Sequence, residues 1–298
     1  MLLQHFPTIM VKSLLIHAHA KVNLYLDVTG KRSDGYHDIE TVFHSIELHD
    51  DVILRPLSNP VISIQCDHPS VPCDTQNLAY QAALLLMNHA DTMCGVEISI
   101  KKRIPVAAGL AGGSTDAAAV LWGMNQLFDF GLTQTDLMCL GLQLGADVPF
   151  CLLGGAAIGR GVGEVLTPLP PLDETYILLA NPGIEVRTRW AFQHLHFALT
   201  NKSADDIILR GCLENGDRRG VAENMYNCLE VPVFLKFPDI EALKRKLAGY
   251  HESYGALMSG SGATVFSIMR NAASAHEAAS GLSGRLAFCT ATLTSDAG

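Results

Sequence analysis

Apolar and polar residues alternate near the beginning of the chain, from Leu14 to Val28. Alternation with a period of two predicts a β-strand with one face in the core. The apolar face carries Val22, Leu24, Leu26 and Val28, and the polar face carries Lys21, Asn23, Tyr25 and Asp27. Lys21 and Asn23 therefore point to the same side of the sheet. A lysine on the polar face of a strand is ordinarily a solvated residue, so the pattern alone gives Lys21 no function.

The next segments predict a turn, several short strands and a helix. Residues 29–37 are rich in the glycine, aspartate and serine of turns, and strand-like runs follow at 39–48, 51–56 and 61–66. Asn77 is a suitable N-cap for a helix that continues to Met87. Residues 95–105 alternate again and predict a strand, which leads directly into a glycine-rich segment.

The glycine-rich segment runs from Pro105 to Asp116 and continues into a helix predicted over residues 114–128. It holds Gly109, Gly112, Gly113, Ser114, Thr115 and Asp116. The glycines permit positive φ and a close approach of the backbone to a ligand, and the three residues after them are types that cap helices. A helix start of this kind binds anions, most often phosphate, although the segment alone fits a well-capped helix equally well. The spacing excludes a Walker loop and a G-x-G-x-x-G motif.

A second candidate residue is Asp147, which lies among apolar neighbours in the segment from Ala146 to Cys151. It follows a helix that we predict to begin at a capping box formed by Thr133 and Asp136 and to end at Gly145. On its own, an aspartate at this place is a turn or cap residue. Glycines at 159, 161 and 163 then predict a hairpin, and the prolines at 168, 170 and 171 indicate a domain boundary.

The second half of the chain predicts an α+β layer. It opens with an apolar strand at 176–180, and helical segments follow near 188–198, 203–214, 217–229 and 239–249. A glycine turn at 260–262 separates two strands, and a helix at 271–281 and a strand at 286–292 close the layer. Because 298 residues can form two hydrophobic cores, we expect domains at 1–168 and 169–298.

The composition indicates a compact soluble protein, since 48% of the residues are hydrophobic and 17% are charged. The formal net charge of −9 argues against sequence-independent binding of nucleic acid, which needs clustered lysine and arginine. No apolar run approaches the ~20 residues of a membrane span, and no signal peptide is predicted. We therefore expect a cytoplasmic protein, a monomer or weak homodimer, with neither nucleic acid nor membrane as a partner.

The cysteines and histidines give no sign of a disulfide framework or a metal site. The eight cysteines show no regular spacing, which is typical of reduced, mostly buried residues in a cytosolic protein. Cys66 and Cys73 flank a short loop but lack the close ligand pairs of a metal site. Other candidate ligands are His17, His19, His44 and His49. Because isolated histidines on sheets are mostly structural or surface residues, we expect no bound metal in the protein itself.

Five motifs, in the order in which they occur along the chain, resemble those of the GHMP kinase superfamily. They are most similar to those of its branch that phosphorylates 4-diphosphocytidyl-2-C-methyl-D-erythritol. Three are typical of the superfamily: Ala20 to Leu26, Pro105 to Ala118 and Met258 to Phe266. Two are typical of the branch: Asp34 to His37 and Leu144 to Pro149. The resemblance implies a two-domain α+β architecture, with an N-terminal ribosomal-protein-S5-domain-2-like domain and a C-terminal ferredoxin-like domain. The active site is expected in the cleft between them.

The resemblance also implies an activity and a set of site residues. The activity would be ATP-dependent phosphorylation of the 2-hydroxyl of this substrate, with Mg²⁺ accompanying ATP, in the non-mevalonate (methylerythritol phosphate) route to isoprenoids. Asp147 would accept the proton of the hydroxyl, and Lys21 would offset the charge on the transferring phosphoryl group. The ATP side would comprise Asn77, Lys102, Pro105, Gly109, Gly112, Gly113, Ser114 and Thr115. The acceptor side would comprise Asn23, Tyr36, His37, Thr188, Phe192, Gly260, Ser261 and Gly262.

Several alternatives stay open at this point. Tyr36 and His37 would receive a cytosine with Phe192 as their aromatic partner, but Phe192 also fits a core residue, and residues 260–262 also fit a simple tight turn. Asp116 stands where many relatives have asparagine. This extra carboxylate would repel phosphates, be turned away as a helix cap, or help to hold Mg²⁺.

Three rival functions fit parts of the same pattern. The first is a kinase for another small alcohol, such as mevalonate or homoserine, and the binding of cytidine nucleotides would distinguish it. The second is a related decarboxylase, which would release CO₂. The third is a noncatalytic nucleotide-binding module, against which the presence of both Lys21 and Asp147 counts.

Overall fold

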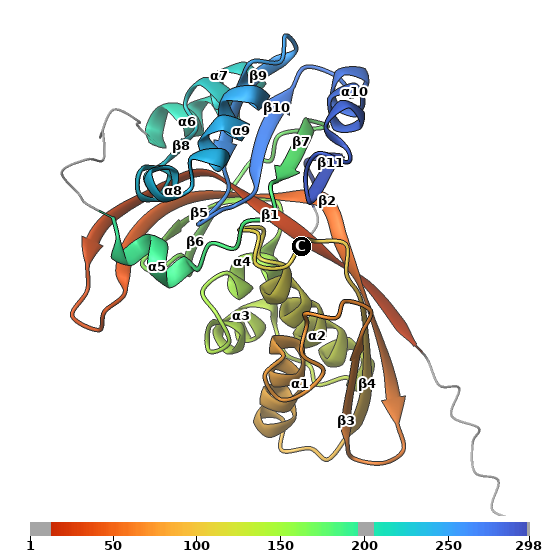
Figure 1. Ribbon diagram of the computed structural model, residues 1–298. Coiled ribbons are helices and arrows are strands. Elements are labelled where there is room, and N and C mark those ends of the chain that lie inside the picture. The colour runs from red at the N-terminus through yellow and green to blue at the C-terminus, as the bar shows by residue number, and fades with distance from the viewer. Residues whose placement is uncertain (1–12, 196–205, 297–298) are drawn as a thin grey trace, which may run out of the picture.

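The computed structural model describes residues 13–195 and 206–296. The chain forms two sheets with helices packed on them, the N-terminal half in the lower part of Figure 1 and most of the C-terminal half in the upper part. The first sheet has seven strands and the second has four. This architecture confirms the predicted α+β class.

Two long antiparallel strands, β1 (Leu14–Lys31) and β2 (His37–Leu57), run through the middle of the molecule (Figure 1). At one end β2 pairs with β4 (Gly95–Lys101), and at the other it pairs with β5 (Ala156–Arg160). The two separate strands expected at 39–48 and 51–56 are therefore one strand. The sheet is completed by β3 (Ile62–Cys66), β6 (Val165–Leu169) and β8 (Tyr226–Asn227).

The prediction of a half-buried strand is wrong for the middle of β1. Every side chain from Ala20 to Leu26 is buried, including those of Lys21 and Asn23. The apolar side of β1 packs on residues of the second sheet such as Leu179 and Phe266. The polar side is covered by elements of the first half. Apolar and polar residues therefore alternate along β1 even though both of its faces are buried.

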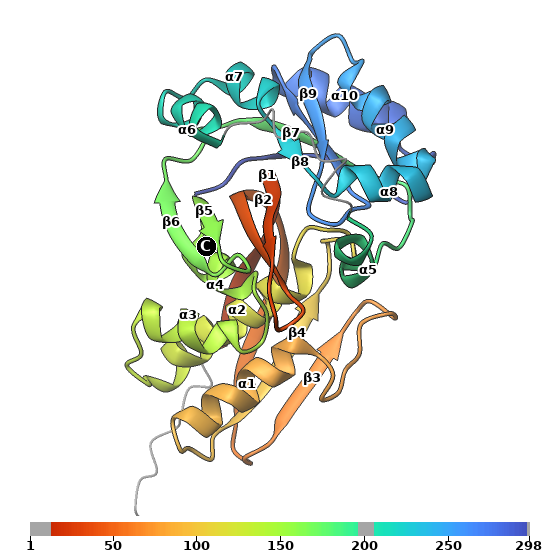
Figure 2. The ribbon, with the colours of Figure 1, turned by 90° about the vertical axis from the view of Figure 1, so that its left-hand side faces the viewer.

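The described part of the first half contains four helices: α1 (Leu78–His89), α2 (Gly112–Phe128), α3 (Gln134–Leu142) and α4 (Val148–Leu153). Figure 2 shows α1, α2 and α3 together on one side of the strands β2, β4 and β3. Asn77 caps α1 by accepting a 2.9 Å hydrogen bond from the backbone N–H of Ala79, as predicted. The predicted capping box of Thr133 and Asp136 is also present at the start of α3.

The second sheet is antiparallel throughout and has the order β11-β7-β10-β9. Its strands are β7 (Tyr176–Asn181), β9 (Ser253–Met258), β10 (Val265–Met269) and β11 (Phe288–Leu293). The helices of this half are α5 (Thr188–Gln193), α6 (Asp206–Glu214), α7 (Arg218–Glu223), α8 (Glu230–Lys236), α9 (Pro238–Ala248) and α10 (Ala272–Leu282). Helices α9 and α10 pack on the strands of this sheet (Figure 1).

The prediction of one continuous helix at 217–229 is wrong. It ends at Glu223, and Tyr226 and Asn227 form β8, which pairs in parallel with Tyr25 and Leu26 of β1. A partner strand that is remote in sequence stabilises this extended segment, so no local pattern announces it. Helix α5 is likewise shorter than the predicted 188–198, of which residues 196–198 lie outside the described part of the chain.

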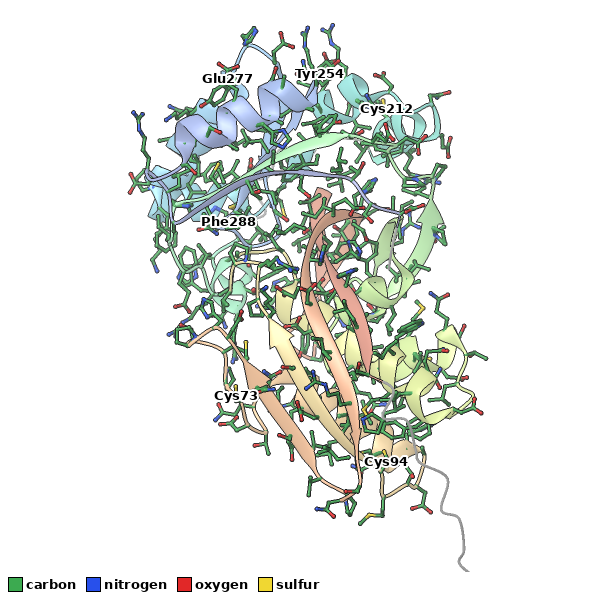
Figure 3. The ribbon with its side chains drawn as sticks, turned by 90° about the vertical axis from the view of Figure 1, so that its right-hand side faces the viewer. Cys73, Cys94, Cys212, Tyr254, Glu277 and Phe288 are labelled. Carbon is green, nitrogen blue, oxygen red and sulfur yellow. The ribbon has the colours of Figure 1, made fainter. Side chains whose placement is uncertain are left out.

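The two halves are packed against each other through a shared core that contains residues of β1, β2, β7 and β10. Because β8 from the second half joins the first sheet, a domain division near residue 168 stays a prediction. All eight cysteines are free, and the labelled Cys73, Cys94 and Cys212 lie far apart in Figure 3. Only Cys151 and Cys228 are buried, so the expectation of mostly buried cysteines is wrong. Within the described ranges, no helix combines the length and apolar character needed to cross a bilayer.

Candidate active site

A cavity of about 1140 Å³ lies between the two layers and collects most of the residues singled out from the sequence. Those that line it are Lys21, Asn23, Tyr36, His37, Gly109, Gly112, Gly113, Ser114, Asp147, Thr188, Phe192, Gly260 and Ser261. They come from the β1–β2 hairpin, the glycine-rich segment, the turn before α4, α5 and the β9–β10 loop. The lining does not include Asn77, Lys102, Pro105, Thr115 or Gly262.

Lys21 and Asp147 meet on the wall of this cavity. The Nζ atom of Lys21 lies 3.6 Å from Oδ2 of Asp147, with 5% of the lysine side chain and 37% of the aspartate side chain exposed. The pairing of β1 with β2 is irregular between His19 and Lys21, and such bulges re-aim the side chains beside them. Asp147 occupies the N-cap position of α4 without making a side-chain capping bond, so its carboxylate is available to the cavity.

A relay of buried polar side chains holds Lys21 in place. Lys21 Nζ donates a 2.8 Å hydrogen bond to Oδ1 of Asn23, and Nδ2 of Asn23 donates a 2.8 Å bond to Oγ1 of Thr41. Thr41 donates in turn to the carbonyl of Tyr25 at 2.6 Å. The lysine also lies over the ring of Phe43, 5.2 Å from its centroid. Since the amide of Asn23 is engaged in this relay, its predicted contact with the acceptor stays a prediction.

The glycine-rich segment brings the start of α2 to the cavity. The helix begins at Gly112 after Ala111, which has a positive φ of 59° and makes no side-chain capping bond. The expectation that Ser114, Thr115 and Asp116 cap this helix is therefore wrong. Thr115 instead donates to the carbonyl of His19 at 2.7 Å, and no backbone partner is present for the N–H groups of residues 112–114 among the described residues. These free donors and the positive end of the helix dipole suit an anion.

Gly109 has to be glycine because the β9–β10 loop packs directly on it. A Cβ atom at this position would lie 2.3 Å from the carbonyl oxygen of Ser259, and the φ of Gly109 is +77°. The hydroxyl of Ser259 donates to the carbonyl of Gly109 at 2.9 Å and lies 3.3 Å from the backbone nitrogen of Asn23. The motifs at residues 20–26 and 258–266 therefore meet the glycine-rich segment around Ser259.

Lys102 is the centre of a buried ion cluster behind the glycine-rich segment. Its Nζ donates to Asp50, to Asp116 at 2.7 Å and to the carbonyl of Gly112 at 3.4 Å. Asp50 also accepts from the backbone N–H groups of Arg103 at 2.5 Å and Ile104 at 2.9 Å. The cluster thus connects β2, β4 and the first turn of α2.

The charges in this cluster are set by burial and by their neighbours. Burial raises the pKa of Asp116 to about 7, although the charge of Lys102 opposes the shift. For Lys102, burial lowers the pKa, but the carboxylates of Asp116 and Asp50 outweigh it and the net shift is upward. Asp116 is therefore the lysine's partner, a role not foreseen from the sequence. The contact of Lys102 and of the helix cap Asn77 with adenosine stays a prediction, because both side chains are occupied elsewhere.

Aromatic residues from two distant segments meet at the far end of the cavity. The rings of His37 and Phe192 lie 5.6 Å apart between centroids, and Tyr36 beside them is 66% exposed. Burial lowers the pKa of His37, which favours the neutral imidazole. Phe192 also packs against the core of the second half, so it belongs both to the core and to the cavity wall.

The β9–β10 loop is held by residues that the sequence reasoning missed. Nδ2 of Asn227 donates to the carbonyls of Met258 at 2.7 Å and Gly260 at 2.8 Å. Glu230 accepts from the backbone N–H of Met258 at 2.9 Å and pairs with Lys244. Both residues lie in or beside a segment that was expected to be a regular helix, so no sequence pattern indicated their role. Ser261 of the loop bonds Thr188 of α5 at 2.9 Å.

Comparison with known sequences identifies the same family on both sides of the cavity. The family description "GHMP kinases N terminal domain" matches residues 77–155, and "GHMP kinases C terminal" matches residues 209–287. The chain is 42% identical over 284 residues to a 4-diphosphocytidyl-2-C-methyl-D-erythritol kinase of Acetivibrio thermocellus, covering 95% of this chain and 100% of that one. It is also 42% identical over 280 residues to the enzyme of that name from Gloeobacter violaceus, covering 92% and 91%.

Comparison with solved structures agrees. A crystal structure of a 4-(cytidine 5'-diphospho)-2C-methyl-D-erythritol kinase matches with a TM-score of 0.80 and 35% identity, covering 96% of this chain and 100% of that one. The homoserine kinase of Cytophaga hutchinsonii shares the fold at 19% identity, with a TM-score of 0.76 over 98% of this chain and 97% of that one. The chain therefore belongs to the GHMP kinases, in the branch of the 4-diphosphocytidyl-2-C-methyl-D-erythritol kinases.

Proposed function

We propose that this chain transfers the γ-phosphoryl group of ATP to the 2-hydroxyl of 4-diphosphocytidyl-2-C-methyl-D-erythritol. The observation that carries the proposal is the position of the Lys21–Asp147 pair on the cavity wall. The same cavity is lined by the start of α2 and by the aromatic group of Tyr36, His37 and Phe192. ATP at the start of α2 and the cytidyl acceptor at the aromatic group would thus approach Lys21 and Asp147 from two sides of the cavity.

The start of α2 is the part of the cavity suited to the ATP phosphates. Its free N–H groups and helix dipole favour anions, and Gly112 and Gly113 offer little steric hindrance. Mg²⁺ would supply further charge neutralisation between the phosphates when it is bound with ATP. Ser114 and Asp147 both line the cavity, and their side-chain oxygens suit a hard cation that keeps most of its waters. Asp116 is engaged with Lys102 and does not line the cavity.

Asp147 and Lys21 supply the protein's part of the chemistry. The acceptor oxygen attacks the γ-phosphorus, the bond from that phosphorus to ADP breaks, and the hydroxyl proton passes to the Asp147 carboxylate. The side-chain nitrogen of Lys21 lies beside this carboxylate, where an ammonium group would offset negative charge on the transferring group. Because Asn23 and Thr41 fix the lysine, little reorganisation is required when the substrates bind.

The aromatic end supports a cytidyl acceptor over a smaller alcohol. A cytosine needs a ring face for stacking, which Tyr36 or Phe192 provides, and a hydrogen-bonding partner for its edge, which the neutral His37 provides. Lys31, Arg187 and Arg189 also line the cavity and would neutralise the diphosphate of the acceptor. These cations were not identified from the sequence.

The rival functions are compatible with the fold, but the aromatic residues and cations of the cavity do not favour them. Homoserine kinase, mevalonate kinase and mevalonate diphosphate decarboxylase structures all match below 20% identity, with TM-scores of 0.76, 0.71 and 0.68, so the fold does not choose between them. The relatives at about 42% identity carry the name of the cytidyl-substrate kinase. A noncatalytic module would not need a buried relay that aims Lys21 at Asp147.

The test is ADP formation from Mg-ATP with 4-diphosphocytidyl-2-C-methyl-D-erythritol, compared with mevalonate, homoserine and no acceptor. Turnover with the cytidyl acceptor alone is expected. Turnover with mevalonate or homoserine alone would show that the proposed acceptor is wrong. ADP formation at the same rate without any acceptor would show that the protein hydrolyses ATP and transfers no phosphoryl group to an alcohol.

A further inference from the structure

A cluster of two histidines and an aspartate lies outside the cavity, on the exposed face of the first sheet. In the antiparallel pairing of β1 and β2, His17 is opposite Asp51 and His19 is opposite His49. Their neighbours Ala18 and Val52 point into the core beneath α1 and α2. His17, His49 and Asp51 therefore point to the other face, which is turned toward the viewer in Figure 3, with the helices behind the sheet. None of the three lines the catalytic cavity.

The distances in the cluster fit a bound zinc ion. Nδ1 of His17 lies 3.0 Å from Oδ1 of Asp51, and Nε2 of His49 lies 3.5 Å from the same oxygen. One ligand atom from each residue lies within 4.8 Å of the others. Around a tetrahedral zinc ion with bonds of about 2.0–2.1 Å, ligand atoms are about 3.3 Å apart. Two of the three separations are thus already close to the required value.

The hydrogen bonds of His49 orient it as a metal ligand. Its Nδ1 lies 2.6 Å from the carbonyl oxygen of Glu47, and since a carbonyl only accepts, Nδ1 carries the proton. In the neutral imidazole, Nε2 then presents a lone pair to the Asp51 carboxylate, which is also an acceptor. Two acceptors face each other unless a proton or a cation lies between them. A backbone carbonyl on the second ring nitrogen is also the usual outer partner of a zinc-bound histidine.

Arg103 prepares the carboxylate for this role. Its guanidinium donates to Oδ2 of Asp51 at 2.5 Å, which leaves Oδ1 to the two histidines. The guanidinium of Arg103 always carries a positive charge, so it pairs with the carboxylate form of Asp51. The other two histidines considered from the sequence are engaged elsewhere: His19 bonds the carbonyl of Ile46, and His44 is buried and accepts from the N–H of Leu172.

We propose that His17, His49 and Asp51 form a zinc site, with water completing the coordination sphere on the exposed side. His17 is 51% exposed, so solvent and the ion reach the site directly. From the sequence, His17 and His49 were two of four candidate histidines, and no bound metal was expected. The structure forms the ligand set across two strands instead, which a search along the chain does not reveal.

The site is tested by Zn²⁺ titration of the full-length chain, after removal of metals with a chelator, using calorimetry. His17→Ala and His49→Ala should each weaken the tightest zinc binding by at least about 10-fold. His251→Ala is the matched control, because His251 pairs with the Glu252 carboxylate at 3.0 Å but belongs to no three-residue cluster in the described chain. All variants retain the eight cysteines, so zinc bound by thiols contributes equally to each titration.

A second measurement does not depend on the variants. In NMR spectra of the unmodified chain, substoichiometric Zn²⁺ should first perturb two histidine rings, and these signals should be the ones missing from the spectra of His17→Ala and His49→Ala. Equal zinc affinity in all chains, an equal loss in the His251→Ala control, or first perturbation of other histidines would each overturn the proposal.

Discussion

The Nζ atom of Lys21 lies 3.6 Å from Oδ2 of Asp147, although the two residues come from motifs on either side of the glycine-rich segment in the sequence. The lysine is buried and tied to Asn23, whereas the aspartate is more exposed and makes no capping bond with α4. A fixed cation beside an accessible carboxylate is the arrangement expected where a hydroxyl loses a proton as it attacks a phosphoryl group.

Asp147→Asn should lower kcat by about 10²–10⁴-fold, the usual contribution of a general base. The Michaelis constants for both substrates should change little, because the amide has the same size and only proton acceptance is lost. Steady-state kinetics with each substrate varied in turn measures both quantities.

The control is Glu185→Gln, which removes a carboxylate that also lines the cavity but has no close contact with Lys21. Its kcat should stay near that of the unmodified chain. An Asp147→Asn variant as active as this control would remove Asp147 from the chemical step.

Tyr36→Ala should weaken the cytidyl acceptor while leaving ATP unaffected. Base stacking contributes about 1–3 kcal/mol, which corresponds to roughly 5- to 150-fold in the Michaelis constant for the acceptor. Because Tyr36 is 66% exposed, the substitution should not change the melting temperature. A Michaelis constant that rises for ATP instead would show that the aromatic end does not bind the cytidyl group.

Lys102→Met should destabilise the fold, since it leaves the buried carboxylates of Asp50 and Asp116 without their cation. Breaking a buried pair in this way typically costs about 3–5 kcal/mol. Denaturant unfolding measures the loss. If Lys102 served mainly to bind adenosine, the variant would unfold normally and show only a higher Michaelis constant for ATP.

Asp116 should make stability depend on pH. Its pKa is raised to about 7 in the folded chain from an ordinary value of 3.8, so folding favours the protonated form. This contribution is complete below pH 4 and is lost as the pH rises through 7. Relative to Asp116→Asn, the unmodified chain should therefore lose unfolding free energy between pH 4 and pH 7. Parallel stability curves for the two chains over this range would contradict the shift.

Asn227→Asp should disturb the β9–β10 loop, because an aspartate cannot donate to the carbonyls of Met258 and Gly260. Each buried carbonyl left without a partner costs about 1–3 kcal/mol, so both stability and kcat/KM should fall. Asn224→Asp is the control, since the side chain of Asn224 donates to the carbonyl of Gly220 within its own helix end and not to the β9–β10 loop. Equal effects of the two substitutions would mean that Asn227 has no special role in the loop.

The sequence was most informative where the structure of a motif depends on contacts between residues close together in the chain. The glycine-rich segment predicted a ligand-facing helix start, and the capping box of Thr133 and Asp136 needed only local contacts. It was least informative where distant segments meet. Asp50 and Lys102 are 52 residues apart, and β8 exists only because β1 offers it a partner. The same holds for Lys21, whose burial depends on elements that cover β1 and not on the alternation of β1 itself.

The most direct test of the central claim is ³¹P NMR of the reaction of Mg-ATP with 4-diphosphocytidyl-2-C-methyl-D-erythritol. ADP release alone does not distinguish transfer from hydrolysis, whereas the spectrum shows where the phosphoryl group goes. We expect a new phosphomonoester signal on the acceptor to grow in step with ADP, with the diphosphate signals of the acceptor retained. Inorganic phosphate as the only new product, or an unchanged acceptor beside an active reaction with mevalonate or homoserine, would contradict the proposed function.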